Sequence, residues 1–103
     1  MVNDTGNKIY ATEAALEKDA TQWARNRGWY SRKFKAAGRR SIPDRLFIRG
    51  GVVFIVEFKR LGNEPTDQQW LEIDALLEAQ ADVVWLDSIE DFRACLIARE
   101  GFK

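Results

Sequence analysis

The feature that most constrains this fold is a glycine pair between two apolar, β-rich segments. Gly50 and Gly51 separate residues 44–49 from residues 52–59, and such a pair is typical of a two-residue β-hairpin. With a two-residue turn, Arg49 pairs with Val52, so Asp44 lies opposite Glu57 on the same face of the sheet. A β-bulge would shift this register by one residue. The rest of the chain must therefore be arranged around this hairpin.

The segments before the hairpin predict a helix and a strand. Residues 12–27 have helical apolar spacing, with Thr12 as a plausible N-cap and Gly28 placed to end the helix. Residues 29–36 are expected to form an irregular strand, followed by a basic loop over residues 37–43. Within the hairpin itself, residues 52–56 are apolar on both faces, as expected for a covered central strand.

The segments after the hairpin predict two more helices and a strand. Thr66 and Gln69 form a capping box for a helix that runs to about residue 80. Residues 83–86 predict a short buried strand, and Ser88 opens a third helix. The positions expected to face inward on the two helices are Trp70, Ile73, Leu76, Leu77, Phe92, Leu96 and Ile97. The order αβββαβα indicates one mixed α/β domain over residues 1–103, with residues 1–10 as a flexible N-terminal arm.

Composition limits the chemistry. The 103 residues contain no His and one Cys, Cys95, which excludes Ser-His and Cys-His nucleophile pairs, His-based zinc sites and disulfide frameworks. No run of 18 apolar residues or signal-peptide pattern occurs, so we expect no membrane association and a cytoplasmic location. Catalysis would need carboxylates, Lys, Arg or hydroxyl groups, together with a hard metal ion.

Charge is distributed unevenly along the chain. Residues 25–60 carry eleven basic and two acidic residues, whereas the segments on either side are net acidic. Trp29, Tyr30 and Phe34 lie within the basic segment. This pattern favours nucleic-acid binding over the alternative of a solvated charged face. Trp23, Trp70 and Trp85 fall at periodic apolar positions and are expected in the core.

The predicted hairpin brings two carboxylates together. Asp44 and Glu57 would repel each other unless a cation lies between them. Strand alternation places Lys59 on the same face as Glu57, with Phe58 pointing away. A divalent cation with a nearby lysine would account for polar residues at the end of so apolar a strand.

These residues resemble a known family. Pro43-Asp44 followed by Glu57-Phe58-Lys59 is similar to the motif of the PD-(D/E)XK nuclease superfamily. The basic loop and the helical glutamine narrow the resemblance to the VRR-NUC family (virus-type replication-repair nucleases), over roughly residues 12–87. The resemblance implies a restriction-endonuclease-like αβββαβ core, a mixed sheet flanked by helices, with an extra C-terminal helix. It also implies an endonuclease that hydrolyses DNA with Mg²⁺, for which Mn²⁺ would substitute.

The resemblance assigns roles to particular residues. Asp44, Glu57 and the backbone carbonyl of Phe58 would bind the metal, and Lys59 would orient the attacking water or stabilise developing charge. The helical glutamate of the family falls best on Glu17, a further candidate ligand, with Glu13 as the alternative. The helical glutamine falls best on Gln69, with Gln68 as second choice. Ser41 departs from the glycine that is common before the motif aspartate.

The same resemblance indicates the substrate and the assembly. Small stand-alone members resemble phage enzymes that act as homodimers on branched DNA such as four-way (Holliday) junctions. The resemblance thus implies that the expected cytoplasmic location is in a bacterium or a phage-infected host cell. The alternatives are a nicking or flap- and end-trimming nuclease of the same chemistry, and a DNA-binding module without catalysis. The side chains expected to contact DNA are Lys33, Lys35, Arg39, Arg40, Arg45 and Arg60.

Overall fold

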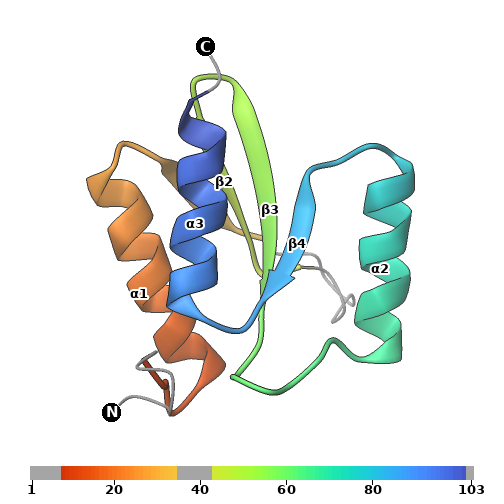
Figure 1. Cartoon of the computed structure of the whole chain (residues 1–103). Helices are drawn as coiled ribbons and strands as arrows, with labels where there is room; N and C mark the ends of the chain where they lie inside the picture. Colours follow the sequence, from red (N-terminus) through yellow and green to blue (C-terminus); the bar gives the residue numbers. More distant parts are fainter. Residues whose placement is uncertain (1–7, 35–42, 102–103) are drawn as a thin grey trace.

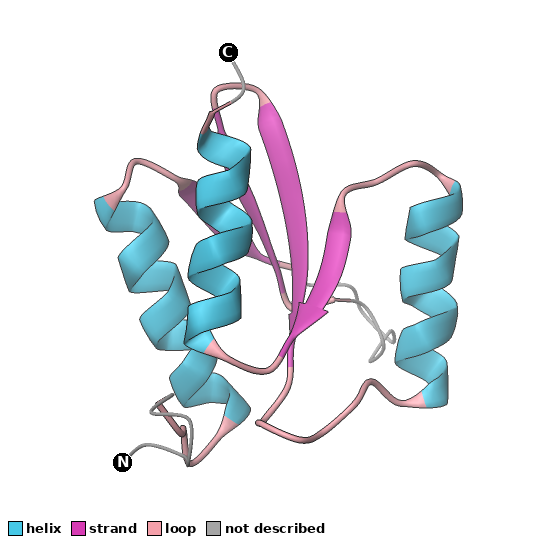
Figure 2. Ribbon diagram, in the orientation of Figure 1, coloured by secondary structure: helices cyan, strands magenta, loops and turns pink. Residues whose placement is uncertain are grey.

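The protein folds as three helices around a four-stranded mixed sheet (Figures 1 and 2). The computed structural model describes residues 8–34 and 43–101. In chain order the elements are α1 (Glu13–Asn26), β1 (Tyr30–Lys33), β2 (Arg45–Arg49), β3 (Val52–Phe58), α2 (Asp67–Glu78), β4 (Val83–Leu86) and α3 (Ile89–Glu100). This is the predicted α/β order. Most of the predicted basic loop lies outside the described residues.

The hairpin has the predicted register. Strand β2 pairs antiparallel with β3, and Arg49 lies opposite Val52 and Arg45 opposite Val56. Gly50 and Gly51 have φ angles of 58° and 83°, which glycine adopts without strain and which match the preferred two-residue hairpin turn. One further step of the same register places Asp44, just before β2, opposite Glu57.

The sheet order is β1-β2-β3-β4, with β4 parallel to β3 and the other pairs antiparallel. Because parallel neighbours need a crossover connection, α2 links β3 to β4. Helices α1 and α3 lie side by side against one face of the sheet, and α2 lies apart from them (Figure 1). The end of β3 therefore faces the starts of α1 and α2.

The core lies between the sheet and the α1–α3 pair. Phe47, Phe54 and Phe58 point from the strands into this layer and are fully buried. Phe92 of α3 packs against Phe47 and Phe58, with ring centroids 5.1 and 5.7 Å away. Alternation along β3 then puts Glu57 and Lys59 on the opposite face, towards α2. The same alternation that directs the phenylalanines into the core thus directs the motif residues towards α2.

The helix starts agree with the predicted caps. The side chains of Thr12, Thr66 and Ser88 each accept a backbone hydrogen bond, and Thr66 and Gln69 form a complete capping box. Before α1, the backbone N–H of Lys8 donates to Glu90 and the Tyr10 hydroxyl donates to Asp19. The last part of the predicted N-terminal arm therefore packs on the domain.

The second face of the sheet is covered less than expected. Helix α2 packs mainly on β4, so Val53 of β3 is 47% exposed and Leu77 of α2 is 50% exposed. The prediction that Leu77 faces inward was therefore wrong. The same prediction was wrong for Ile97 of α3, which is 50% exposed, whereas Phe92 and Leu96 are buried as expected. No helix among the described residues is long and apolar enough to cross a membrane.

Candidate active site

A buried carboxylate, Glu57, and a partly buried one, Asp44, lie near each other where β2 begins and β3 ends. Glu57 is only 2% exposed. Asp44 accepts a hydrogen bond at Oδ2 from the Phe58 backbone N–H, at 2.7 Å. A residue in an antiparallel ladder directs its N–H and its C=O towards the same neighbour. The Phe58 carbonyl therefore points in the same direction as the Phe58 N–H, towards Asp44, which directly precedes β2.

The surroundings of this pair disfavour negative charge. Burial and the nearby Asp44 carboxylate raise the pKa of Glu57 to about 8, against the lowering effect of Lys59. Burial also raises the pKa of Asp44, with contributions from Glu17 and Glu13, against the lowering effect of the Phe58 N–H. Two carboxylates with these pKa shifts form a site that a cation would stabilise.

Lys59 and Gln69 complete the cluster. Lys59 is 7% exposed, and its Nζ donates to Gln69 Oε1 at 3.1 Å. Gln69 Nε2 donates to Glu57 Oε2 at 2.9 Å. The Thr66 backbone N–H also donates to Gln69 Oε1, at 2.9 Å. Gln69 therefore connects both motif residues to the start of α2, whereas the second choice, Gln68, is exposed.

The two candidate helical glutamates face different partners. Glu13 Oε1 lies 3.5 Å from Lys59 Nζ. Glu17 Oε2 instead lies 2.9 Å from Arg45 Nε and 3.6 Å from Lys33 Nζ. Both glutamates raise the pKa values of Asp44 and Glu57, so both lie near the carboxylate pair. Only Glu13 contacts the motif lysine directly.

The donor set suits a hard divalent cation. Across residues 8–34 and 43–101, no group of three or more His, Cys, Asp or Glu side chains is arranged to hold a metal ion. Mg²⁺ does not require such a group, because it is usually held by one or two carboxylates and several waters. Asp44, Glu57 and the Phe58 carbonyl offer only oxygen ligands, and the raised pKa values indicate unbalanced negative potential.

The predicted DNA-contacting residues divide into three groups. Lys33 is more than half exposed although it pairs with Glu17, and Arg60 is exposed. Arg45 is only 16% exposed and is held by Glu17 and by Ser31 Oγ, so its guanidinium is already occupied. Lys35, Arg39, Arg40 and Ser41 lie outside the described residues.

One residue near the site was assigned to the core from its spacing. Trp85 of β4 pairs with Glu57 of β3 in the parallel register and is only partly buried. It packs edge-on against Trp70 of α2, with ring centroids 6.3 Å apart. Apolar spacing alone could not separate a buried tryptophan from one at the border of a site.

Comparison with known proteins identifies relatives of this chain. It is 36% identical over 77 residues to "Putative nuclease p44" of Acyrthosiphon pisum secondary endosymbiont phage 1, covering 74% of this chain and 83% of that protein. A solved structure described as "VRR_NUC domain" superposes with a TM-score of 0.76 at 25% identity, covering 90% of this chain and all of that one. No family model matches the sequence.

Proposed function

The chain belongs to the VRR-NUC family, and from this we propose that it is a metal-dependent nuclease that hydrolyses DNA phosphodiester bonds. The observation that carries this proposal is the cluster of Asp44, Glu57, Lys59 and Gln69 at one edge of the sheet. A buried glutamate and a buried lysine beside a second, partly buried carboxylate form an unstable arrangement without a function to retain it.

Asp44, Glu57 and the Phe58 carbonyl would hold Mg²⁺ or Mn²⁺. When bound, such an ion lowers the pKa of water and offsets negative charge on a phosphate. Glu13, which contacts Lys59, and Glu17, which is paired with Arg45, are the next carboxylates. Glu13 can approach the site without breaking the Glu17–Arg45 pair.

Lys59 supplies the positive charge for the reaction. Its ammonium group is held by Gln69 and Glu13, so it is fixed in position before a phosphate arrives. A preorganised cation stabilises charge that develops in the transition state more effectively than a mobile one. Gln69 is a positioning residue, because it orients both the Lys59 ammonium and the Glu57 carboxylate.

The proposed substrate is branched DNA, including four-way junctions, cut by a homodimer. A single chain carries one cluster of this kind among its described residues, whereas symmetric cutting of a junction needs two sites related by a two-fold axis. The relative named above is a phage protein, and phage replication produces branched DNA. The exposed Lys33 and Arg60 and the basic residues 35–40 would contact flanking phosphates.

A cleavage assay tests this proposal. The protein is incubated with junction, flap, single-stranded and plain duplex DNA of one shared sequence, with Mg²⁺, with Mn²⁺ or with EDTA. We expect cleavage with either ion and none with EDTA, and faster cleavage of the junction than of the duplex. Sedimentation at micromolar protein should give twice the mass of one chain.

Three outcomes would change the proposal. Cleavage in EDTA would exclude metal dependence. Equal rates on junction and duplex, or a preference for flaps, would replace the branched substrate by a nicking or trimming activity. Tight DNA binding without cleavage under any ion would instead indicate a DNA-binding module.

A further inference from the structure

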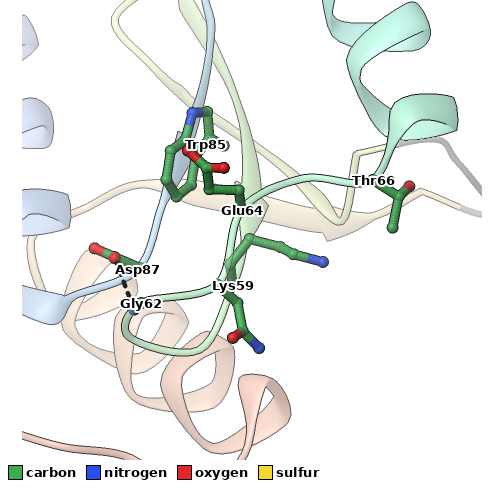
Figure 3. A pocket seen from close by; sticks show the side chains of 7 residues that line it. Lys59, Gly62, Glu64, Thr66, Trp85 and Asp87 are labelled. Carbon is green, nitrogen blue, oxygen red and sulfur yellow. Dashed lines mark hydrogen bonds between the residues drawn. The ribbon is translucent and has the colours of Figure 1, made fainter.

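A pocket of about 630 Å³ opens beside Lys59, between Trp85 and Asp87 at the end of β4 and the loop that leads to Thr66 (Figure 3). Lys59, Asn63, Glu64, Trp85 and Asp87 contribute to its lining. We call it the Trp85 pocket. Its volume is within the range of sites that hold small organic groups. The proposed metal-binding cluster does not use Trp85, Asn63, Glu64 or Asp87, so the pocket needs its own explanation.

The pocket is held open by the chain segment between β3 and α2. The Gly62 backbone N–H donates to Asp87 Oδ2 at 3.2 Å (Figure 3), which fixes this loop to the end of β4. Gly62 has a φ angle of 86°, a conformation that favours glycine. Trp85 is supported from behind by Trp70. Two of the elements that line the pocket, the Gly62 loop and Trp85, are therefore held in place by contacts within the protein.

The Trp85 pocket directly adjoins the proposed reaction centre. Trp85 pairs with Glu57 in the sheet, and neighbouring strands lie only about 4.8 Å apart. Lys59 is common to the cluster and the pocket. A group in this pocket would therefore belong to a nucleotide next to the scissile phosphate.

Away from Lys59, the pocket chemistry does not suit a phosphate. Glu64 and Asp87 both line this part, and carboxylates repel a phosphate. They instead accept hydrogen bonds from exocyclic amino groups, as carboxylates do from cytosine N4. The indole of Trp85 offers an aromatic surface, and every base can stack on such a surface.

We propose that the Trp85 pocket binds one unstacked nucleobase of the DNA strand being cut, with a preference for a base that carries an amino group. This inference rests on the proposed nuclease function and names a feature of its substrate. A base within a duplex is paired and stacked, so it must leave the helix to reach Trp85. The substrate class is therefore DNA with an unpaired or easily extruded nucleotide beside the cleavage point.

A base-removal scan tests the proposal. The scissile phosphate is first mapped on the best substrate. The two nucleotides on its 5′ side and the two on its 3′ side are then replaced by abasic nucleotides, one at a time, which gives four substrates. Base–aromatic stacking predicts that one replacement lowers kcat/KM by about 10-fold, while the other three have smaller effects. At the sensitive position, cytosine or adenine should be cut faster than thymine. Indifference of the wild-type enzyme to all four replacements would overturn the proposal.

Variants connect the effect to this pocket. Trp85→Leu should cut the normal and the abasic substrate at the same rate, so the 10-fold difference disappears. Trp23→Leu is the matched control, because Trp23 is also a partly buried tryptophan but packs on Phe92, in the α1–α3 layer. It should keep the difference. Retention of the full difference by a folded Trp85→Leu variant would refute the assignment.

A second variant does not depend on the stability of β4. Glu64 is exposed on the loop, so Glu64→Ala, which removes the acceptor oxygens, should fold normally. It should reduce the preference for cytosine and adenine over thymine, whereas Glu78→Ala, an exposed change at the end of α2, should not. An unchanged preference in Glu64→Ala would exclude the amino-group contact of Glu64.

A binding assay separates failure of this inference from failure of the proposed function. Single-stranded DNA containing 2-aminopurine is titrated with protein in EDTA, and stacking on Trp85 should quench its fluorescence. Quenching that Trp85→Leu removes and Trp23→Leu retains would support the pocket even if no DNA is cut. Binding without quenching, or no binding of this strand, would overturn the pocket and leave the nuclease proposal intact, because that proposal is tested by cleavage in the presence of metal ions.

Discussion

Glu57→Gln should stabilise the metal-free protein although it removes activity. Glu57 is buried, its pKa is raised to about 8 from an ordinary value of 4.5, and Asp44 lies nearby. A carboxyl group with a raised pKa keeps its proton in the folded state while the unfolded chain loses it. The free energy of unfolding should therefore fall as pH rises from about 4.5 to about 8.

The size of this effect follows from the pKa interval. At about 1.4 kcal/mol per unit, the shift from 4.5 to about 8 amounts to at most about 5 kcal/mol at alkaline pH. A glutamine removes this penalty and still accepts the hydrogen bond from Gln69 Nε2. Lys59 and Gln69 lose a charged partner, which offsets part of the gain. We expect a net stabilisation of about 2 kcal/mol at pH 8, or a Tm about 8–15 °C higher.

The measurement is thermal and urea unfolding in EDTA between about pH 4.5 and pH 8. Wild type should lose stability over this interval, and Glu57→Gln should lose much less. Glu64→Gln, which changes an exposed glutamate, should follow the wild-type curve. Added Mg²⁺ should stabilise wild type by binding to the folded state and should stabilise Glu57→Gln less. Equal or lower stability of Glu57→Gln at pH 8 would refute the reasoning.

Three further predictions concern single side chains. Lys59→Ala should reduce cleavage by at least about 10²-fold while DNA affinity, measured by anisotropy, stays close to that of wild type; an unchanged rate would place the reaction elsewhere. Glu13→Gln should reduce kcat at unchanged Tm because Glu13 contacts Lys59, whereas Glu17→Gln should lower Tm because Arg45 loses its partner. The reverse pattern would make Glu17 the glutamate of the reaction centre and Glu13 the structural one. Hydrogen bonds from Arg27 and Trp29 lower the pKa of Glu100 to about 2, so the stability that its carboxylate adds is lost as pH falls from about 4.5 to about 2. In acid unfolding, Glu100→Gln should therefore lose less stability over this pH interval than wild type.

Much of the backbone arrangement could be predicted because it depends on local signals. Gly50-Gly51 sets the hairpin register, and Thr66 with Gln69 sets the start of α2. Both signals act through neighbouring residues, so no knowledge of distant contacts was needed. The pairing of Asp44 with Glu57 follows from the same register, which is why the centre of the site could be located from sequence.

Burial on the second face of the sheet could not be predicted in this way. An apolar residue such as Val53 or Leu77 gives the same periodic signal whether or not another element covers it. Coverage depends on where α2 crosses the sheet, and α2 packs mainly on β4. Trp85 lies at the border of the covered area, and only the tertiary structure shows that it lines a pocket.

The choice between Glu13 and Glu17 shows a second limit. The two glutamates lie one turn apart on the same face of α1, so helical spacing cannot separate them. The separation comes from the cations that each can reach: Arg45 of β2 occupies Glu17, and Lys59 after β3 approaches Glu13. Which glutamate a long side chain such as Arg45 or Lys59 contacts depends on the tertiary structure. The predicted pairing of strand positions does not give this information.

Gln69 has two separate roles, of which the sequence indicated the capping role by local spacing and the site role through the family resemblance. Its position in the capping box is a local requirement of α2, and its amide also contacts Lys59 and Glu57. These roles share one oxygen, since Oε1 accepts from both Thr66 N–H and Lys59 Nζ. Any shift of the first turn of α2 would therefore move the Lys59 ammonium and the Glu57 carboxylate together. The start of α2 is thus fixed relative to the proposed reaction centre, although the rest of this helix contacts little beyond β4.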